Sequence, residues 1–419
     1  MLKLTPMGQE PGNVCFENLE AYVRSHVEAL IQRVLIEEVD EHLGRGPHAR
    51  RDACGAAGYR NGYGKERSLS TAVGTITVRR PRVRGTEEQF VSRVLPLFVR
   101  HTRAVHELLP ELYLHGLASG DFELAMRGLL GDGAPLSASS IGRLKACWQA
   151  EYESWKQRNL SQQNVVYLWV DGIYVKAGLE KDKAALLVIV AACADGSKCV
   201  LAVEAGHRES ESSWGSVLRD LKARGMNCPR LVVGDGALGI WSALRGVYPD
   251  AGEQRCWIHR MRNVLDCVGK KKQAQAKELL TKVMYGDSLA EAHSTKRIFQ
   301  VWARGNGCDK AADALERDWD RMVAYYALPK EHWVHLRTTN LVESPFASVR
   351  LRTTAAKRFK RIDAATAMIW KLLMVAEKTF RRLRARELMA DVAAGAIYKD
   401  GVPVAAPKSV PEKQYSKAA

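Results

Sequence analysis

Two carboxylates in the middle of the chain each directly follow a short apolar segment. "VVYLWV" (165–170) has the β-branched and aromatic residues of a buried strand and precedes Asp171, while "LVVG" (231–234) precedes Asp235. A glycine follows each acid, so either Asp-Gly pair taken alone also fits a turn after a strand. Two carboxylates held close together repel each other, and a divalent cation removes that cost. The placement of the strands therefore decides between turn residues and a metal site.

The order of elements favours the metal site. The pattern is strand, hairpin, strand, helix, strand: apolar segments flank Asp195-Gly196, and "SESSWGSVLRDLKARGM" (210–226) has one apolar helical face. If the first three strands are antiparallel, a right-handed crossover returns the fourth strand beside the first and parallel to it. Asp171 and Asp235 would then share one edge of a mixed sheet, where ligands of such sheets gather. Oxygen ligands of this kind favour Mg²⁺ or Mn²⁺.

A third acid lies far downstream, beside a basic stretch. "HLRTTNLVESPFASVRLRTTAAKRFKR" (335–361) places Glu343 before a run of Arg and Lys without an intervening acid. Asn340 and Glu343 have the spacing of a helix capping box, a purely structural alternative, but Pro345 favours a helix start nearer Ser344. An acid before a basic helix suits a metal at a phosphodiester whose flanking phosphates contact the basic side chains. The candidate phosphate contacts are Arg350, Arg352, Lys357 and Arg358.

Cys256 and His259, in "QRCWIHRMRNVLD" (254–266), are also candidate site residues. Two ligands make only half of a structural zinc site, and no companion Cys-x-x-Cys or His-x-x-x-His pair lies nearby. Packing and hydrogen bonding close to Asp235 is the favoured interpretation, and positioning of scissile DNA by His259 is kept as another.

The overall charge points to a polyanionic partner. A formal charge of +16 over 419 residues favours nucleic acid, whereas an anionic membrane surface has no further support. The longest apolar run, "AALLVIVAACA" (184–194), is too short for a bilayer and suits a buried strand, and the N-terminus lacks the apolar core of a signal peptide. Nine cysteines without a regular framework indicate reduced thiols. We expect a cytoplasmic protein of two or three domains without a membrane partner.

The N-terminal part has two recognisable segments. Residues 25–44 form an apolar helical stripe with Gly44 as its stop, which packs into a local core or mediates self-association. Residues 60–85 alternate β-formers with polar residues and carry many arginines, which predicts a small basic hairpin. Its basic side chains either contact the DNA backbone or are simply exposed to solvent on one face of the hairpin. The stripe of the helix is Val27, Leu30, Ile31, Val34 and Leu35.

Residues 103–157 predict three helices. The first ends at Gly116, and Asp121 and Ser137 can cap the second and third. The spacing resembles a helix-turn-helix unit, although any three-helix bundle shares it. In that unit the third helix enters the major groove by its N-terminal part, with Arg143 and Lys145 as candidate DNA contacts.

Four blocks in this order carry a resemblance to a known family: "WVDGIYVKAG" (169–178), "LVVGDGALGIWSAL" (231–244), "QRCWIHRMRNVLD" (254–266) and "RTTNLVESPFASVRLRT" (337–353). Together they resemble the signature blocks of Mutator-type transposases of bacterial insertion sequences, DDE transposases with a ribonuclease-H-like core. The likeness covers nearly the whole chain. Pro345 and Phe346 depart from many relatives and affect the local helix start.

The resemblance implies an α/β fold, with a ribonuclease-H-like mixed sheet interrupted by an all-helical insertion and preceded by a helical DNA-binding region and a small β segment. The expected division is an N-terminal helical segment 1–58, a basic β segment 59–100, a helix-turn-helix-like region 101–160, the first part of the core 161–262, the insertion 263–330, the C-terminal part of the core 331–392 and a disordered tail 393–419.

The resemblance also implies the chemistry. The family's catalytic triad falls on Asp171, Asp235 and Glu343, and its Cys-x-x-His signature on Cys256 and His259. Such a site uses two Mg²⁺ ions, for which Mn²⁺ substitutes, to hydrolyse the phosphodiester at the element's end and then to join the freed 3′-OH to another strand. The implied partners are terminal inverted repeats and target DNA, bound by at least a homodimer in the bacterial cytoplasm at the nucleoid.

Two alternatives differ in testable ways. A ribonuclease-H-like nuclease cuts but does not join, and it needs neither the helical insertion nor separate end-recognition segments. A non-catalytic DNA-binding regulator uses only residues 1–160 and does not need the three acids.

Overall fold

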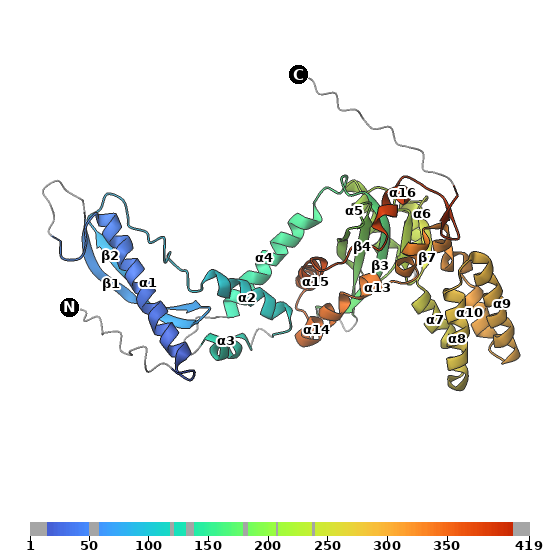
Figure 1. Ribbon diagram of the computed structural model, residues 1–419, viewed down its shortest axis with the longest axis horizontal. Helices are drawn as coiled ribbons and strands as arrows, with labels where there is room; N and C mark the ends of the chain where they lie inside the picture. Colours follow the sequence, from blue (N-terminus) through green and yellow to red (C-terminus); the bar gives the residue numbers. More distant parts are fainter. Residues whose placement is uncertain are drawn as a thin grey trace, which may run out of the picture. The chain divides into compact units, whose positions relative to one another are not determined.

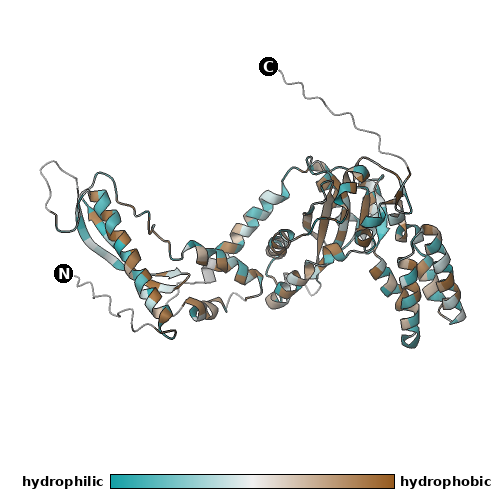
Figure 2. Cartoon of the chain, viewed as in Figure 1, coloured by the Kyte–Doolittle hydropathy of each residue, from teal (hydrophilic) through white to brown (hydrophobic). Residues whose placement is uncertain are grey.

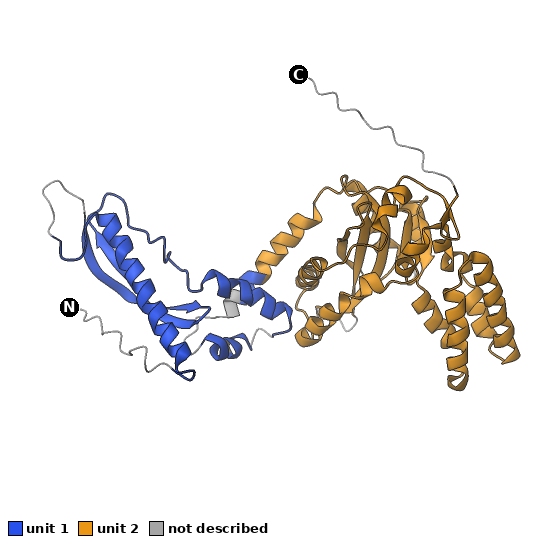
Figure 3. Cartoon of the chain, in the orientation of Figure 1, with its two compact units in different colours: residues 1–144 blue, residues 145–419 orange. Residues whose placement is uncertain are grey.

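The structure is a computed structural model that describes residues 15–49, 58–117, 121–130, 138–178, 183–206, 208–236 and 239–404. The chain divides into two compact units, residues 1–144 and residues 145–419 (Figure 3). The basic β segment belongs to the first unit, and all three candidate acids belong to the second.

The first unit contains one long helix packed on a hairpin. Helix α1 (Leu19–Leu43) lies against strand β2 (Gly74–Arg84), which pairs antiparallel with β1 (Tyr59–Thr71). Both predicted elements are therefore confirmed. Gly44 ends α1 with a φ of +63°, the left-handed conformation that favours glycine at this position.

The apolar stripe predicted for α1 is only partly correct. Leu35, Val39 and Leu43 are buried at a spacing of four residues, whereas Leu30 is 55% exposed. Leu30 precedes Leu35 by five residues, which places it about 140° away around the helix, off the face that contacts the hairpin.

Three helices follow in the region predicted to read DNA: α2 (Arg103–Leu114), α3 (Phe122–Leu130) and α4 (Ala138–Lys156). The predicted turn before the third helix and its candidate cap, Ser137, lie outside the described residues. The boundary between the two units falls within α4.

The second unit is built on a five-stranded mixed sheet, whose apolar strands are visible in Figure 2. The strand order is β5-β4-β3-β6-β7, with β3, β4 and β5 antiparallel and with β6 and β7 parallel to β3 (Figure 1). The predicted return of the fourth strand beside the first is therefore confirmed. The strands are β3 (Val165–Val175), β4 (Ala184–Cys193), β5 (Lys198–Gly206), β6 (Leu231–Gly234) and β7 (Gly252–Arg255).

Two helices cover one face of this sheet. Leu168 and Val170 of β3 belong to a buried cluster with α5 (Glu211–Ala223) and α6 (Ile240–Val247). The apolar face predicted for α5 is confirmed, because its Trp214, Val217, Leu218 and Leu221 are all buried there.

The opposite face carries the alternate residues of β3. The Tyr167 hydroxyl lies 2.9 Å from His332 Nδ1, and Trp169 Nε1 donates to the carbonyl oxygen of His335 at 3.0 Å. Since side chains alternate along a strand, Asp171 follows Trp169 onto this second face.

The segment after β7 is helical, as the pattern of residues 263–330 predicts. Its helices pack on one another and return to the sheet edge at β7. They are α7 (Trp257–Leu265), α8 (Gln273–Met284), α9 (Leu289–Gly305), α10 (Asp309–Glu316) and α11 (Trp319–Met322), with short 3-10 turns at Lys270–Lys272, Ala324–Ala327 and Lys330–His332.

The C-terminal part returns to the sheet. Its elements are α12 (Trp333–Leu336), α13 (Asn340–Glu343), α14 (Phe346–Ala356), α15 (Ile362–Glu377), the 3-10 turn Arg386–Leu388, α16 (Met389–Ala393), β8 (Tyr398–Lys399) and β9 (Val402–Pro403). Within the part of the chain described, no helix combines the length and apolar composition needed to cross a membrane.

The prediction of a disordered tail is wrong for residues 393–404. Strands β8 and β9 form a short hairpin there, because its turn is held by the protein body: Gly401 N donates to the Tyr326 carbonyl oxygen, and Asp400 Oδ1 accepts from Leu289 N at 2.6 Å. Residues 405–419 lie outside the described residues.

Candidate active site

The register of two parallel strands brings Asp171 and Asp235 side by side. Val170 of β3 lies opposite Gly234 of β6; Asp171 is the next residue of β3, and Asp235 directly follows the end of β6. The topology inferred from the sequence therefore places both carboxylates at one edge of the sheet.

The sequence pattern places Asp171 at the end of its strand, and this prediction is wrong. Strand β3 continues to Val175 along β4, with Asp171 opposite Val188, because β4 extends past the point where β6 ends. Gly172 is accordingly an in-strand residue rather than part of a turn. The turn interpretation fits only Gly236, whose φ is +82°.

Other acids surround Asp171. Burial, together with the charges of Asp235, Glu343 and Glu209, raises the pKa of Asp171 to about 7. The hydrogen bond from Gly172 N to Asp171 Oδ1, at 2.8 Å, acts in the opposite direction. Four carboxyl groups thus share one electrostatic environment, in which a divalent cation would offset their mutual repulsion.

Glu343 reaches this environment from a single helical turn. Helix α13 packs against β3 and β4, with Val342 fully buried, and the Thr339 hydroxyl donates to the Glu343 carboxylate. The three acids predicted from the sequence are therefore brought together by β3, β6 and α13.

The capping-box alternative for Glu343 is wrong. Asn340 N donates to Thr338 Oγ1 at 3.4 Å, and the Glu343 side chain is engaged by Thr339 instead. The helix breaks where Pro345 predicts, since α13 ends at Glu343 and α14 begins at Phe346.

Sequence reasoning missed Glu209, which precedes α5. Glu209 is only 8% exposed, and the Tyr174 hydroxyl donates a hydrogen bond to it. Burial and the charge of Asp235 raise the pKa of Glu209, while Tyr174 and His259 oppose this shift. A topological signal was available: β5 runs in the same direction as β3, so residues just after its end lie at the same edge as Asp171.

Cys256 and His259 lie beside Glu343 and are linked to it by Thr339. Thr339 N and Thr339 Oγ1 each lie 3.3 Å from Cys256 Sγ, and His259 Nδ1 lies 3.9 Å from Glu343 Oε1. The hydrogen bond between Cys256 and His259 raises the pKa of His259 to about 9. Burial alone would raise the pKa of Cys256, but its hydrogen bonds with His259 and Thr339 lower it.

These contacts match the packing and hydrogen-bonding interpretation of the Cys-x-x-His pair. The ligand atoms of Cys256, His259 and Glu343 lie within 4.8 Å of one another. This is a three-donor cluster in which one donor is a candidate catalytic acid, so a closed structural zinc site is not formed by these residues.

The predicted DNA contacts fall into two groups. Arg143, Lys145, Arg350, Lys357 and Arg358 are exposed, as contact with a phosphate backbone requires. Arg352 is only 2% exposed, which contradicts its predicted role because a buried guanidinium cannot reach flanking phosphates. Helix α14 turns this residue inward, toward the interior that also contains Val349 and Phe346.

Known transposases are similar in sequence to this chain. A profile of the family "Transposase, Mutator family" matches residues 13–382. The chain is 44% identical over 295 residues to a transposase for insertion sequence element IS6120 of Mycolicibacterium smegmatis, covering 70% of this chain and 91% of that protein. It is 37% identical over 298 residues to a transposase for element IST2 of Acidithiobacillus ferrooxidans, covering 70% and 99%. The chain therefore belongs to the Mutator family of transposases.

Proposed function

We propose that this protein is a DDE transposase that cleaves DNA at the ends of an insertion sequence and joins the freed 3′-OH to target DNA. The observation that carries the proposal is the convergence of Asp171, Asp235 and Glu343: burial raises the pKa of Asp171, and the charges of Asp235 and Glu343 raise it further. The names of the relatives, transposases for insertion sequence elements, support the same function. The strand order β5-β4-β3-β6-β7 supports a ribonuclease-H-like core.

The donor set fits divalent metal ions. Carboxylate oxygens are the ligands that Mg²⁺ and Mn²⁺ prefer, and Asp171 is a buried acid whose pKa is raised by burial and by the charges of the neighbouring acids. Asp171, Asp235 and Glu343 would hold two such ions, with Mg²⁺ as the natural choice and Mn²⁺ as a substitute. When bound, these ions activate a water or a 3′-OH as nucleophile and stabilise the leaving oxygen of the phosphodiester.

The protein's own residues position the reacting groups. Asp171 lies within β3, and Asp235 directly follows the neighbouring strand β6; strands hold a site more rigidly than loops do. Glu343 comes from a helical turn, and Thr339 and His259 restrain its carboxylate. Both reaction steps are in-line displacements at phosphorus, so no nucleophilic Ser or Tyr is assigned.

DNA is the partner in this proposal. Arg350, Lys357 and Arg358 lie on α14 and just beyond it, downstream of Glu343, where they are exposed and can contact phosphates next to the scissile bond. Arg143 and Lys145 of α4, together with the basic hairpin, would recognise terminal inverted repeats. Synapsis of two ends requires at least a homodimer on DNA.

The test incubates purified protein with DNA that bears the element's ends, a target plasmid and Mg²⁺. The proposal predicts site-specific cleavage with a free 3′-OH, followed by joined products. Asp235→Asn should abolish both steps without loss of DNA binding, whereas Asp250→Asn, an exposed aspartate after α6, should retain them. Cleavage without joining would indicate the nuclease alternative, and binding without cleavage the regulator. Full activity of Asp235→Asn would refute the proposal.

A further inference from the structure

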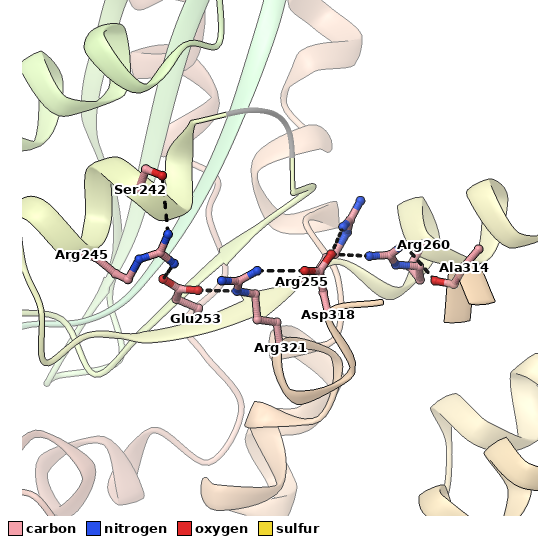
Figure 4. A network of polar contacts seen from close by, with 8 residues as sticks. All are labelled: Ser242, Arg245, Glu253, Arg255, Arg260, Ala314, Asp318 and Arg321. Carbon is pink, nitrogen blue, oxygen red and sulfur yellow. Dashed lines mark hydrogen bonds and ion pairs between the residues drawn. The ribbon is translucent and has the colours of Figure 1, made fainter. Parts of the chain in front are cut away.

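One aspartate, Asp318, forms ion pairs with three arginines where the helical segment meets the edge of the sheet. Its Oδ2 accepts from Arg255 Nη1 at 2.5 Å and Arg260 Nη2 at 2.6 Å, and its Oδ1 accepts from Arg321 Nη1 at 2.9 Å (Figure 4). These arginines come from β7, α7 and α11, so a single carboxylate joins three elements.

The backbone of Asp318 is held in an uncommon conformation. Its φ is +61°, in the left-handed region, which costs a residue other than glycine on the order of 1 kcal/mol. The three arginine contacts offset that cost. Burial would raise the pKa of Asp318, but the charges of Arg255, Arg260 and Arg321 lower it, so the carboxylate stays ionised.

Neighbouring contacts anchor Asp318 to the helical insertion. Arg260, whose side chain is only 3% exposed, donates from Nη1 to the Ala314 carbonyl oxygen near the end of α10 at 3.0 Å. Trp319, the next residue after Asp318, is buried and meets Trp257 of α7 edge-on, with ring centroids 6.2 Å apart. A movement of α10 would therefore be transmitted to Asp318.

Arg255 connects Asp318 to the candidate site. It is the last residue of β7 and lies opposite Gly234, the residue before Asp235. Its guanidinium lies close to Gly236, the residue after Asp235: a Cβ at Gly236 would lie 2.5 Å from Arg255 Nε and 2.6 Å from Arg255 Cζ. The positive φ of Gly236 favours glycine, and a side chain at this position would have to displace the end of Arg255.

The Arg255 side chain is held by its ion pair with Asp318. The Arg255 side chain is 13% exposed, and its buried Nε has no hydrogen-bond partner among the residues that the structure describes. The ion pair with Asp318 therefore holds the end of the Arg255 side chain next to Gly236, on the C-terminal side of Asp235.

We propose that Asp318 and Arg255 are positioning residues that couple the helical insertion to the metal-binding carboxylate of Asp235. Asp318 holds Arg255 against Gly236, and Arg255 in turn restricts the backbone that aims the Asp235 side chain. The inference rests on the proposed function, because it assigns Asp235 to the metal site. Outer partners of this kind typically change metal affinity or activity by about 10- to 100-fold when they are removed.

The test measures Mn²⁺ binding to the full-length protein by electron paramagnetic resonance, without DNA. Asp318→Asn keeps the shape of the side chain and tolerates a left-handed backbone, but it loses the charge that orients Arg255. Its Mn²⁺ dissociation constant should rise about tenfold. Glu316→Gln is the matched control, because Glu316 pairs with Lys296 and Gln300 inside the insertion and should leave Mn²⁺ affinity unchanged.

Two further variants separate positioning from a loss of folding. Arg255→Lys keeps a positive charge for Asp318 but has no planar group to lie against Gly236, so it should weaken Mn²⁺ binding as well. The double variant Asp318→Asn/Arg255→Ala should bind Mn²⁺ no more weakly than Arg255→Ala alone, since both residues act through one contact. With DNA, the single-turnover cleavage rate should fall in Asp318→Asn while the DNA dissociation constant stays the same.

The outcomes are distinguishable. Wild-type Mn²⁺ affinity in Asp318→Asn, or independent multiplicative losses in the double variant, would overturn the coupling and leave the proposed function intact. A wild-type protein that neither binds Mn²⁺ nor cleaves DNA would refute the proposed function itself.

Discussion

The carboxylate of Glu209 lies directly against Gly172, the residue after Asp171. A Cβ at position 172 would lie 2.7 Å from Glu209 Cδ, closer than side-chain atoms approach one another, so only glycine allows this contact. The glycine that looks like a turn residue in the sequence therefore serves to admit a fourth acid beside the three predicted ones. Gly236 plays the corresponding part for Arg255 after the second aspartate.

Glu209→Gln should weaken cation binding and, in the absence of cations, stabilise the protein. Without a cation, removing the charge of Glu209 relieves its repulsion with Asp171. With a cation bound, the same change removes one of the negative charges that attract the cation. The increase in melting temperature caused by excess Mg²⁺ should shrink, and the Mn²⁺ affinity should fall about tenfold. Glu211→Gln, two residues along in the first turn of α5 and exposed, is the control and should behave like the wild type. Equal Mg²⁺ responses in both variants would exclude Glu209 from the site.

The pKa of Asp171 predicts how stability and cation binding depend on pH. The folded protein retains a proton on Asp171 up to about pH 7, while the ordinary value is 3.8. The stability contributed by this proton is fully present below about pH 4 and is lost as the pH rises through 7. A divalent cation competes with the same proton, so affinity should rise by up to about tenfold per pH unit below 7 and level off above it. Calorimetry at pH 6 in buffers of different ionisation enthalpy should detect release of about one proton per binding event. Binding without proton release would show that Asp171 is already ionised.

Thr339→Val should disturb Glu343 more than it disturbs the fold. The substitution keeps the shape of the side chain but removes the hydroxyl that contacts Glu343 and Cys256, at a cost of about 1–3 kcal/mol for the lost hydrogen bonds. Cleavage should fall at least tenfold and recover in Thr339→Ser. Thr366→Val is the control: among the residues that the structure describes, its hydroxyl donates within α15, to the Ile362 carbonyl oxygen, so a similar loss of stability should leave cleavage intact. Equal cleavage in Thr339→Val and Thr366→Val would mean that the hydroxyl does not position Glu343.

Two arginines of α14 should respond in opposite ways. Arg350 is exposed, so Arg350→Ala should weaken DNA binding and reduce the slope of log K against log salt by about 0.9, as expected for one lost phosphate contact. Arg352 is buried, so Arg352→Ala should lower the melting temperature and leave that slope unchanged. Fluorescence anisotropy over a salt series, paired with thermal unfolding, separates the two effects. A reduced slope for Arg352→Ala would reverse the assignment.

Much of the sheet follows from local pattern. The apolar runs before Asp171 and Asp235, the Asp195-Gly196 hairpin and the amphipathic α5 together define a strand order, and that order brings the two acids together. Pro345 likewise predicts the helix break after Glu343, because a missing backbone donor is a property of the residue itself.

The remaining features depend on contacts between distant segments, which local pattern does not contain. Arg352 looks like its neighbours in a basic stretch, and only the packing of α14 decides which arginine points inward. Glu209 resembles any acid near a helix start until β5 brings it to the edge that carries Asp171. Nothing in the local sequence around Asp318 indicates that it forms an ion pair with Arg255, more than sixty residues earlier.

The most direct test of the account is an anomalous-difference map from crystals grown with Mn²⁺. We expect a peak within about 2–2.5 Å of carboxylate oxygens of both Asp171 and Asp235, with Glu343 alongside, and no such peak in Asp171→Asn crystals. A peak located only at Cys256 and His259, or bound Mn²⁺ remote from both aspartates, would contradict it.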